Sequence, residues 1–195
     1  MPLYSVLHTD SSIQRLASDI AQRLGTPSSL QTIQRVPSDD QDVNLFRFLW
    51  TKDFQLLGNK FVEVMAQKVK HTIRQDAQVV IKDVAPGEFK MEVLFLVQSV
   101  YTTQNDELVI LIPLSSDAFA EALAHLKVIE KIKGATHAFH YKENTLHLQS
   151  VDKSGCAEIG LQPETTFIIY GDVRIRTVPP TPFFMLSFRT IKPPV

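Results

Sequence analysis

The sequence predicts an α+β fold with a largely antiparallel sheet and three helices. Three segments have the spacing of amphipathic helices, the segments between them resemble strands, and turn-forming pairs separate neighbouring strands in mid-chain. The predicted order is β-α-β-β-α-β-β-β-α followed by further strands, which favours a layered architecture. Through residue 84 the order is βαββαβ, as in a ferredoxin-like unit, and it continues into a β-rich C-terminal half.

The three helices are predicted from apolar residues that recur every three or four positions. The first spans 11–24, with capping side chains available at 10–12, and the second spans roughly 52–74, with Thr51 as its N-cap. The third spans about 116–133 and opens on serine and aspartate. The predicted core residues on these helices are Ile13, Leu16, Ile20, Leu24, Phe54, Leu57, Phe61, Met65, Val69, Ile73, Phe119, Leu123, Leu126, Ile129 and Ile132.

Strands are predicted between and after the helices, over 3–8, 30–36, 44–50, 77–84, 88–103, 107–114 and 165–177. The turn pairs Pro86-Gly87 and Asn105-Asp106 join three of them, so we expect an antiparallel meander. Segments 93–97 and 108–112 are apolar on both faces and should be central. The later part of 165–177 alternates apolar with charged residues, so that strand should lie nearer the surface.

Composition limits the functions to consider. The 195 residues suit one α+β domain over 1–195, or halves 1–84 and 85–195 sharing a core. Twenty basic and twenty-one acidic residues give a net charge of −1, so nucleic acid is not an expected partner. One cysteine, no signal-like start and no membrane-length apolar run predict a cytoplasmic protein without membrane contact. The absence of a glycine-rich phosphate loop and of G-x-S-x-G, H-E-x-x-H and CxxC motifs predicts no cofactor.

The histidine-rich segment 136–150 suggests a hairpin in which His140 faces His147. His137 falls on the opposite, apolar side. A structural zinc site takes four ligands and a catalytic one three, so His140 and His147 are only weak metal candidates and a solvated pair is favoured. Cys156 lacks the surroundings of a nucleophile and is expected to be a semi-buried thiol at a strand start.

The second helix carries a basic strip opposite its apolar stripe: Lys60, Lys68, His71 and Arg74. Such a strip would suit phosphates or an acidic partner. Nucleic-acid binding is therefore one hypothesis, ranked third after the two that follow below. A charged face opposite a buried face is also what a surface helix normally shows, and no aromatic residues interleave with these charges. We therefore expect a solvated helix face.

The C-terminal segment "PFFMLSFRTI" is the basis of the hypothesis that we favour, a protein that acts by binding another protein. It has apolar groups on both faces, which form a candidate interaction surface of Phe183, Phe184, Met185, Leu186 and Phe188. At a sheet edge one face would need covering by a protein partner or a second copy, which predicts a non-enzymatic interaction or assembly protein.

The alternative is a small-ligand-binding protein or enzyme with a pocket between helices and sheet. Tyr101, Tyr170, His137 or Cys156 would supply its polar contacts. No catalytic, cofactor or metal residue is assigned from the sequence.

Overall fold

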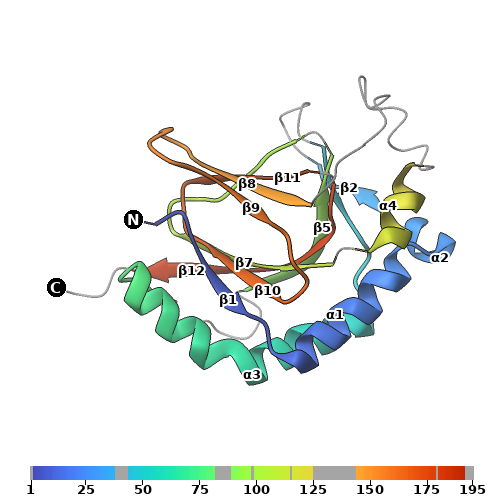
Figure 1. The fold of residues 1–195 in the computed structure, drawn as a ribbon, viewed down its shortest axis with the longest axis horizontal. Helices are drawn as coiled ribbons and strands as arrows, with labels where there is room; N and C mark the ends of the chain where they lie inside the picture. Colours follow the sequence, from blue (N-terminus) through green and yellow to red (C-terminus); the bar gives the residue numbers. More distant parts are fainter. Residues whose placement is uncertain are drawn as a thin grey trace.

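The computed structural model describes residues 2–37, 44–81, 89–97, 99–114, 116–124, 144–178 and 180–191. Within these ranges two antiparallel sheets face each other, and helices cover the outer side of the larger one (Figure 1). The architecture has three layers in the order helices, larger sheet, smaller sheet. A mixed fold with mostly antiparallel sheet is therefore confirmed.

The larger sheet contains eight of the described strands. Its order is β1 (Tyr4–His8), β10 (Thr165–Ile169), β7 (Glu107–Pro113), β12 (Phe183–Ile191), β5 (Lys90–Leu96), β3 (Leu45–Arg47) and β2 (Gln34–Arg35), with β4 (Val80–Ile81) also pairing with β12. The smaller sheet has the order β6 (Tyr101–Thr102), β11 (Val173–Val178), β8 (Thr145–Ser150) and β9 (Cys156–Gly160).

The helices are α1 (Ser11–Leu24), α2 (Pro27–Leu30), α3 (Lys52–Asp76) and α4 (Asp117–Ala124). Asp10 caps α1 by accepting from Ser12 N at 2.8 Å, and Thr51 caps α3 by accepting from Phe54 N at 3.4 Å. The first two predicted helices are thus confirmed. The third is described only over 117–124, and its predicted remainder lies outside the described residues.

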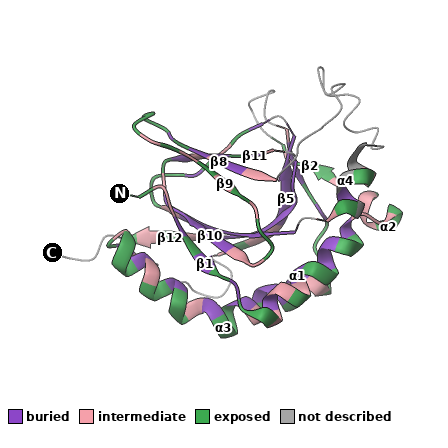
Figure 2. Cartoon of the chain, in the orientation of Figure 1, coloured by how far each residue is buried: buried purple, intermediate pink, exposed green. Residues whose placement is uncertain are grey.

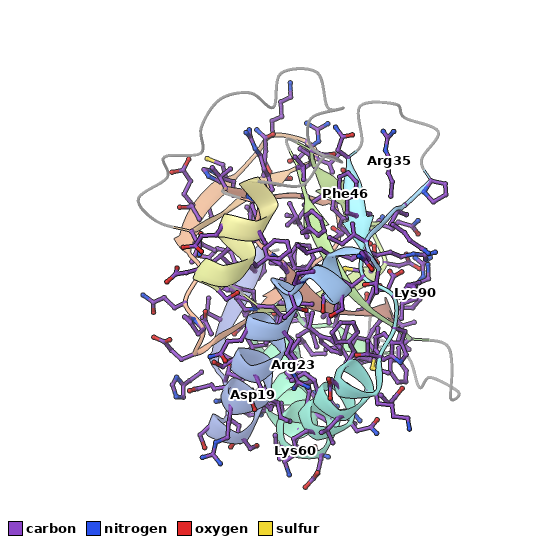
Figure 3. The ribbon with its side chains drawn as sticks, turned by 90° about the vertical axis from the view of Figure 1, so that its right-hand side faces the viewer. Asp19, Arg23, Arg35, Phe46, Lys60 and Lys90 are labelled. Atoms are coloured by element: carbon purple, nitrogen blue, oxygen red, sulfur yellow. The ribbon has the colours of Figure 1, made fainter. Side chains whose placement is uncertain are left out.

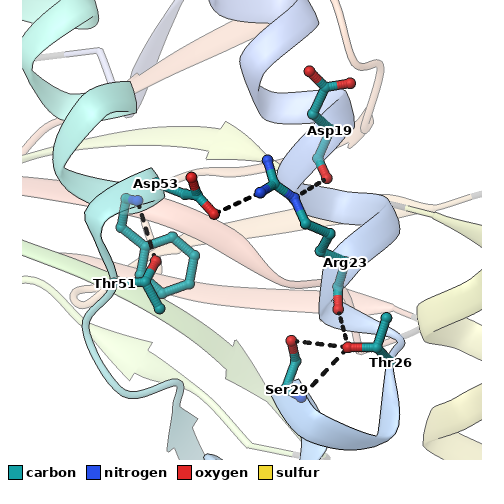
Figure 4. Close-up of polar contacts among 7 residues, drawn as sticks. Asp19, Arg23, Thr26, Ser29, Thr51 and Asp53 are labelled. Atoms are coloured by element: carbon teal, nitrogen blue, oxygen red, sulfur yellow. Dashed lines mark hydrogen bonds and ion pairs between the residues drawn. The ribbon is translucent and has the colours of Figure 1, made fainter.

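The end of α1 meets the start of α3 (Figure 4). Arg23 Nη1 lies 2.7 Å from Asp53 Oδ2, and Arg23 Nε donates to the carbonyl of Asp19. Both charged side chains are about half exposed, so this ion pair contributes little to stability. Helix packing depends instead on the apolar stripes. In Figure 3 Lys60 lies at the outer margin of the helical layer, whereas Phe46 lies among the core side chains.

The larger sheet has an apolar core on each side. Alternate residues of β7 point to opposite faces: Ile110 and Ile112 pack under the helices, whereas Val109 and Leu111 face the smaller sheet. Both faces of β5 and β7 are buried over most of their length (Figure 2), which confirms their predicted central position.

Other strand predictions are wrong because the chain changes sheets where its sequence looks continuous. Segment 88–103 forms β5 in the larger sheet and β6 in the smaller one. Segment 165–177 likewise divides into β10, which is buried on both faces, and β11, which has one solvent-facing side. The predicted strand 30–36 is shortened to β2 (Gln34–Arg35). Leu30 belongs instead to α2, a helix that Pro27 starts at its first turn.

The pairing also differs from the expected meander and from a ferredoxin-like unit. β12 lies between β5 and β7, so these two consecutive long strands do not pair with each other. β1 pairs with β10 at one edge, and β3 pairs with β5 near the opposite edge. The ferredoxin-like order is therefore not confirmed.

The candidate interaction surface lies in the core. Phe183, Phe184, Met185 and Leu186 are at most 4% exposed, because β12 is flanked by β5 and β7 and covered on both faces. Phe188 is partly buried and stacks on Phe89, with ring centroids 5.7 Å apart. The prediction of an exposed apolar strand is wrong. Among the described helices, none is both long enough and apolar enough to cross a bilayer.

Candidate functional site

The space between the two sheets is filled by apolar side chains along most of its length. They come from both sheets and are almost all less than one-tenth exposed: Leu45, Leu94, Leu96, Val109, Leu111, Leu146, Leu148, Phe167, Ile169, Val173, Ile175, Phe183 and Met185. Alternation along the strands produces this uniform interior, because every second residue of each strand faces the opposite sheet.

Polar residues join this interior at one end, where they form a group that we call the Glu107 cluster: Tyr101, Glu107 and Ser187. Glu107 precedes Val109 by two residues and Ser187 follows Met185 by two, so both continue the interior faces of their strands. Tyr101 pairs in register with Ile175, also an interior residue. The cluster thus joins β6, β7 and β12.

The Glu107 carboxylate accepts three hydrogen bonds. Oε1 accepts from the Tyr101 hydroxyl at 3.1 Å and from Ser187 Oγ, and Oε2 accepts from the backbone N–H of Gln104 at 3.0 Å. Hydrogen bonds to a charged group are stronger than those between neutral groups, so the three donors hold the carboxylate in one position. The arrangement joins a fixed acceptor to two hydroxyl groups.

Tyr101 is the proton donor of this cluster. Burial is the main reason that the pKa of Tyr101 is raised above its ordinary value, and the charge of Glu107 and the hydrogen bond to it raise it further. A phenol is neutral at physiological pH even at its ordinary pKa, so the shift widens the pH range over which Tyr101 stays a hydrogen-bond donor. It is held as a donor beside a carboxylate acceptor.

Two ion pairs lie around the cluster. Arg189 pairs with Asp106, and Arg189 is also the register partner of Glu107 on the neighbouring strand. Arg47 Nη1 lies 3.8 Å from Glu92 Oε1, and Glu92 continues the interior face of β5. Lys90, the register partner of Ser187, continues the same face of β5, so with Glu107 included this end of the sandwich carries three acidic groups and three basic ones.

The polar residues proposed for a pocket between helices and sheet do not converge. Tyr101 belongs to the Glu107 cluster, whereas Tyr170 is buried on the helical side of the larger sheet. Its hydroxyl lies 2.8 Å from Ser5 Oγ, which donates to Asp76 at 2.5 Å, and burial raises the pKa of Tyr170. Cys156 begins β9 as predicted but is exposed, not semi-buried. His137 lies outside the described residues.

The first half of the predicted histidine hairpin, residues 136–143, lies outside the described residues. The second half belongs to β8, which pairs with β11 on one side and β9 on the other. His147 lies on the outer face of the smaller sheet between Arg176 and Glu158, with Nδ1 3.2 Å from Glu158 Oε1. His140 lies outside the described residues.

The basic strip is partly used in contacts within the chain. Lys60 Nζ lies 3.0 Å from Glu63 Oε1, and Lys68 Nζ donates to the carbonyl of His8 at 3.0 Å. His71 and Arg74 are exposed on α3. Nucleic-acid binding through this strip stays a hypothesis.

Glu107 and Ser187 were not singled out from the sequence. The available signal was a polar residue at the end of an apolar alternating face, as in Glu107-x-Val109-x-Leu111. That signal also marks any strand that ends at the surface. The three side chains meet only because β7 pairs with β12 and because β6, in the smaller sheet, places Tyr101 within hydrogen-bond distance of Glu107.

No protein-family model and no curated protein matches the chain. Solved structures do match. A prolyl-4-hydroxylase of Pseudomonas putida is 11% identical, with 95% of this chain and 91% of that chain covered and a TM-score of 0.53. A prolyl hydroxylase of Trichoplax adhaerens, in complex with a hypoxia inducible factor peptide fragment, is 8% identical over 97% and 84%, with a TM-score of 0.50.

A third match is EvdO2 of Micromonospora carbonacea complexed with 2-oxoglutarate, at 10% identity, 99% and 88% coverage and a TM-score of 0.43. At these identities the two prolyl hydroxylases show a shared jelly-roll-like fold and no more. The prediction of a non-enzymatic interaction or assembly protein is wrong, because the surface proposed on β12 is buried and the structures that share the fold are hydroxylases, not interaction proteins.

Oxygenases with this fold suggest an iron centre, so we compared the donors present with what iron requires. Non-haem Fe(II) oxygenases bind the metal through two histidines and one carboxylate. The histidines in the described ranges are His8, His71 and His147; His8 and His71 are exposed, and His147 faces outward. No group of three His, Cys, Asp or Glu in these ranges can hold a metal ion. The described residues therefore do not fit such a centre.

Proposed function

We propose that the chain is an enzyme or small-ligand-binding protein that engages its ligand at the Glu107 cluster. The observation that carries the proposal is the convergence of Tyr101, Glu107 and Ser187 on one end of an otherwise apolar interior. Ligand sites typically combine apolar walls with a few convergent polar groups. A titratable group with a shifted pKa, here Tyr101, further supports a functional role.

The cluster suits a ligand that carries hydroxyl or amine groups. The Glu107 carboxylate would accept a hydrogen bond from the ligand in place of one of its present donors, and the neutral Tyr101 phenol would donate to a ligand oxygen. In a reaction these two groups would act as proton acceptor and proton donor. The Glu107 carboxylate disfavours an anionic ligand beside it, because Arg189 and Arg47 are already paired with other acids.

The proposal is tested by thermal denaturation of the full chain with glucose, ethanolamine and a panel of related polyols and amines. A ligand at about one hundred times its Kd should raise Tm by roughly 5–10 °C for a chain of this size. The rise should be lost in Glu107→Gln and reduced in Tyr101→Phe. Glu158→Gln, an exposed acid on the outer face of the smaller sheet, is the matched control and should keep it.

A rise that persists in both cluster variants would show that the ligand binds elsewhere, and no rise with any member of the panel would contradict this ligand class.

We also propose a single domain over 1–195, a cytoplasmic location and self-association. The first two rest on chain length and cysteine usage, and all three stay predictions. Gel filtration with light scattering tests the last of them directly.

A further inference from the structure

We infer that the space between the two sheets is a structural core and that the described residues lining it do not form a metal centre. The inference goes beyond the proposed ligand site, because it concerns the part of the interior that the Glu107 cluster does not reach. It holds whether or not a ligand binds at that cluster.

Large apolar side chains fill the space between the two sheets. Five strands of the larger sheet and two of the smaller one direct large apolar residues into this space, among them Leu111 at 1%, Phe167 at 0% and Leu148 at 2% exposure. A metal centre would require polar donors at such inward-facing positions, together with open coordination sites for the reactants. Over most of the length of the described strands these positions are occupied by buried apolar side chains.

The two carboxylates that face inward already have partners. Glu107 is held by Tyr101, Ser187 and Gln104 N, and Glu92 is paired with Arg47. These contacts orient both carboxylates, and neither carboxylate belongs to a group of three His, Cys, Asp or Glu among the described residues that could hold a metal ion.

Ser99 Oγ is the one buried side-chain polar atom without a hydrogen-bond partner in the described ranges. Ser99 lies two residues before Tyr101, where the chain passes from the larger sheet to the smaller one. An unpartnered buried atom is where a missing group would be expected to bind. A single neutral hydroxyl is a poor iron ligand, so Ser99 does not supply the missing donor set.

The inference is tested by titrating the full chain anaerobically with Fe(II), and separately with Co(II), in the presence and absence of 2-oxoglutarate. Tm and the visible absorption of Co(II) are recorded for the wild type and for Glu107→Gln and Glu92→Gln, which neutralise the inward-facing carboxylates. We expect no saturable rise in Tm, or one that both variants leave unchanged. A saturable rise with a Co(II) absorption band that either variant abolishes overturns the inference.

A second measurement distinguishes a core from a site without using metal. Leu111→Ala removes a side chain between the sheets, and Leu186→Ala removes an equally buried leucine on the helical side of the same sheet. If both spaces are structural cores, Tm falls by similar amounts, within a factor of two. A fall in Leu111→Ala that is a small fraction of that in Leu186→Ala would indicate an under-packed cavity and would overturn the inference.

Discussion

Replacing Gly171 with alanine should destabilise the fold through a collision with the backbone of a neighbouring turn. Gly171 lies between β10 and β11, where the chain passes from the larger sheet to the smaller one. A Cβ at this position would lie 2.2 Å from the carbonyl oxygen of Asn105 and 2.6 Å from that of Gln104. Neither atom can rotate away, since both belong to the turn before β7.

The magnitude follows from how far the backbone must move. Relief of a 2.2 Å contact requires a shift of about an ångström in a segment anchored by Gln104 N on Glu107. Overpacking of this kind costs about 1–3 kcal/mol, and the lack of a flexible partner places Gly171→Ala in the upper half of that range. For a chain of this length the expected fall in Tm is roughly 4–12 °C.

The assay is thermal and urea denaturation followed by circular dichroism, with Gly160→Ala as the matched control. Gly160 ends β9, and a Cβ there would meet nothing within 4 Å. Gly160→Ala should therefore change the free energy of unfolding by less than about 1 kcal/mol. If Gly171→Ala is as stable as Gly160→Ala, the close approach of the two turns is absent and the reasoning is refuted.

Three further substitutions test single polar groups. Ser99→Ala removes a buried hydroxyl that has no partner, so by the same denaturation assay stability should stay equal or rise by about 0.5–2 kcal/mol; a loss above about 1 kcal/mol would reveal a partner. Thr103→Val leaves the buried N–H of Val173 without its 2.9 Å acceptor and should lower the free energy of unfolding by about 1–3 kcal/mol, which urea titration would detect. The third is Tyr101→Phe: because the folded-state pKa of Tyr101 is raised, the unfolded chain loses this proton first, and wild-type stability should fall as pH rises above about 10. Tyr101→Phe should lack that part of the slope, which is at most about 1.4 kcal/mol per pH unit and less after discounting for partial exposure. Equal alkaline slopes in urea titrations at pH 9–11 would contradict the assignment.

The local patterns of the sequence predicted the helices well. The stripe from Phe54 to Ile73 and the cap at Thr51 define α3 without reference to any distant residue, because helical hydrogen bonds and caps join residues close in sequence. The double-sided apolar runs of β5 and β7 likewise identified central strands. Burial on both faces is a property that each strand carries in its own residues.

The neighbours of each strand could not be predicted in this way. The apolar residues of Phe183–Leu186 require burial, but they fit an edge strand covered by a partner as well as the observed place between β5 and β7. Pairing depends on hydrogen bonds and packing between segments far apart in sequence, and many partners satisfy one apolar strand equally well. The functional hypothesis failed at this step, because it depended on which partner β12 has.

The sequence by itself determined the α+β class, two of the helices and the central strands, since these follow from periodicity and local capping. Only the tertiary structure decided that 165–177 divides between two sheets, that His147 pairs with Glu158, and that Tyr101, Glu107 and Ser187 meet. The physical reason is the same in each case. A side chain's face is set by its own strand, whereas its contacts are set by strands that the chain brings alongside from a distance.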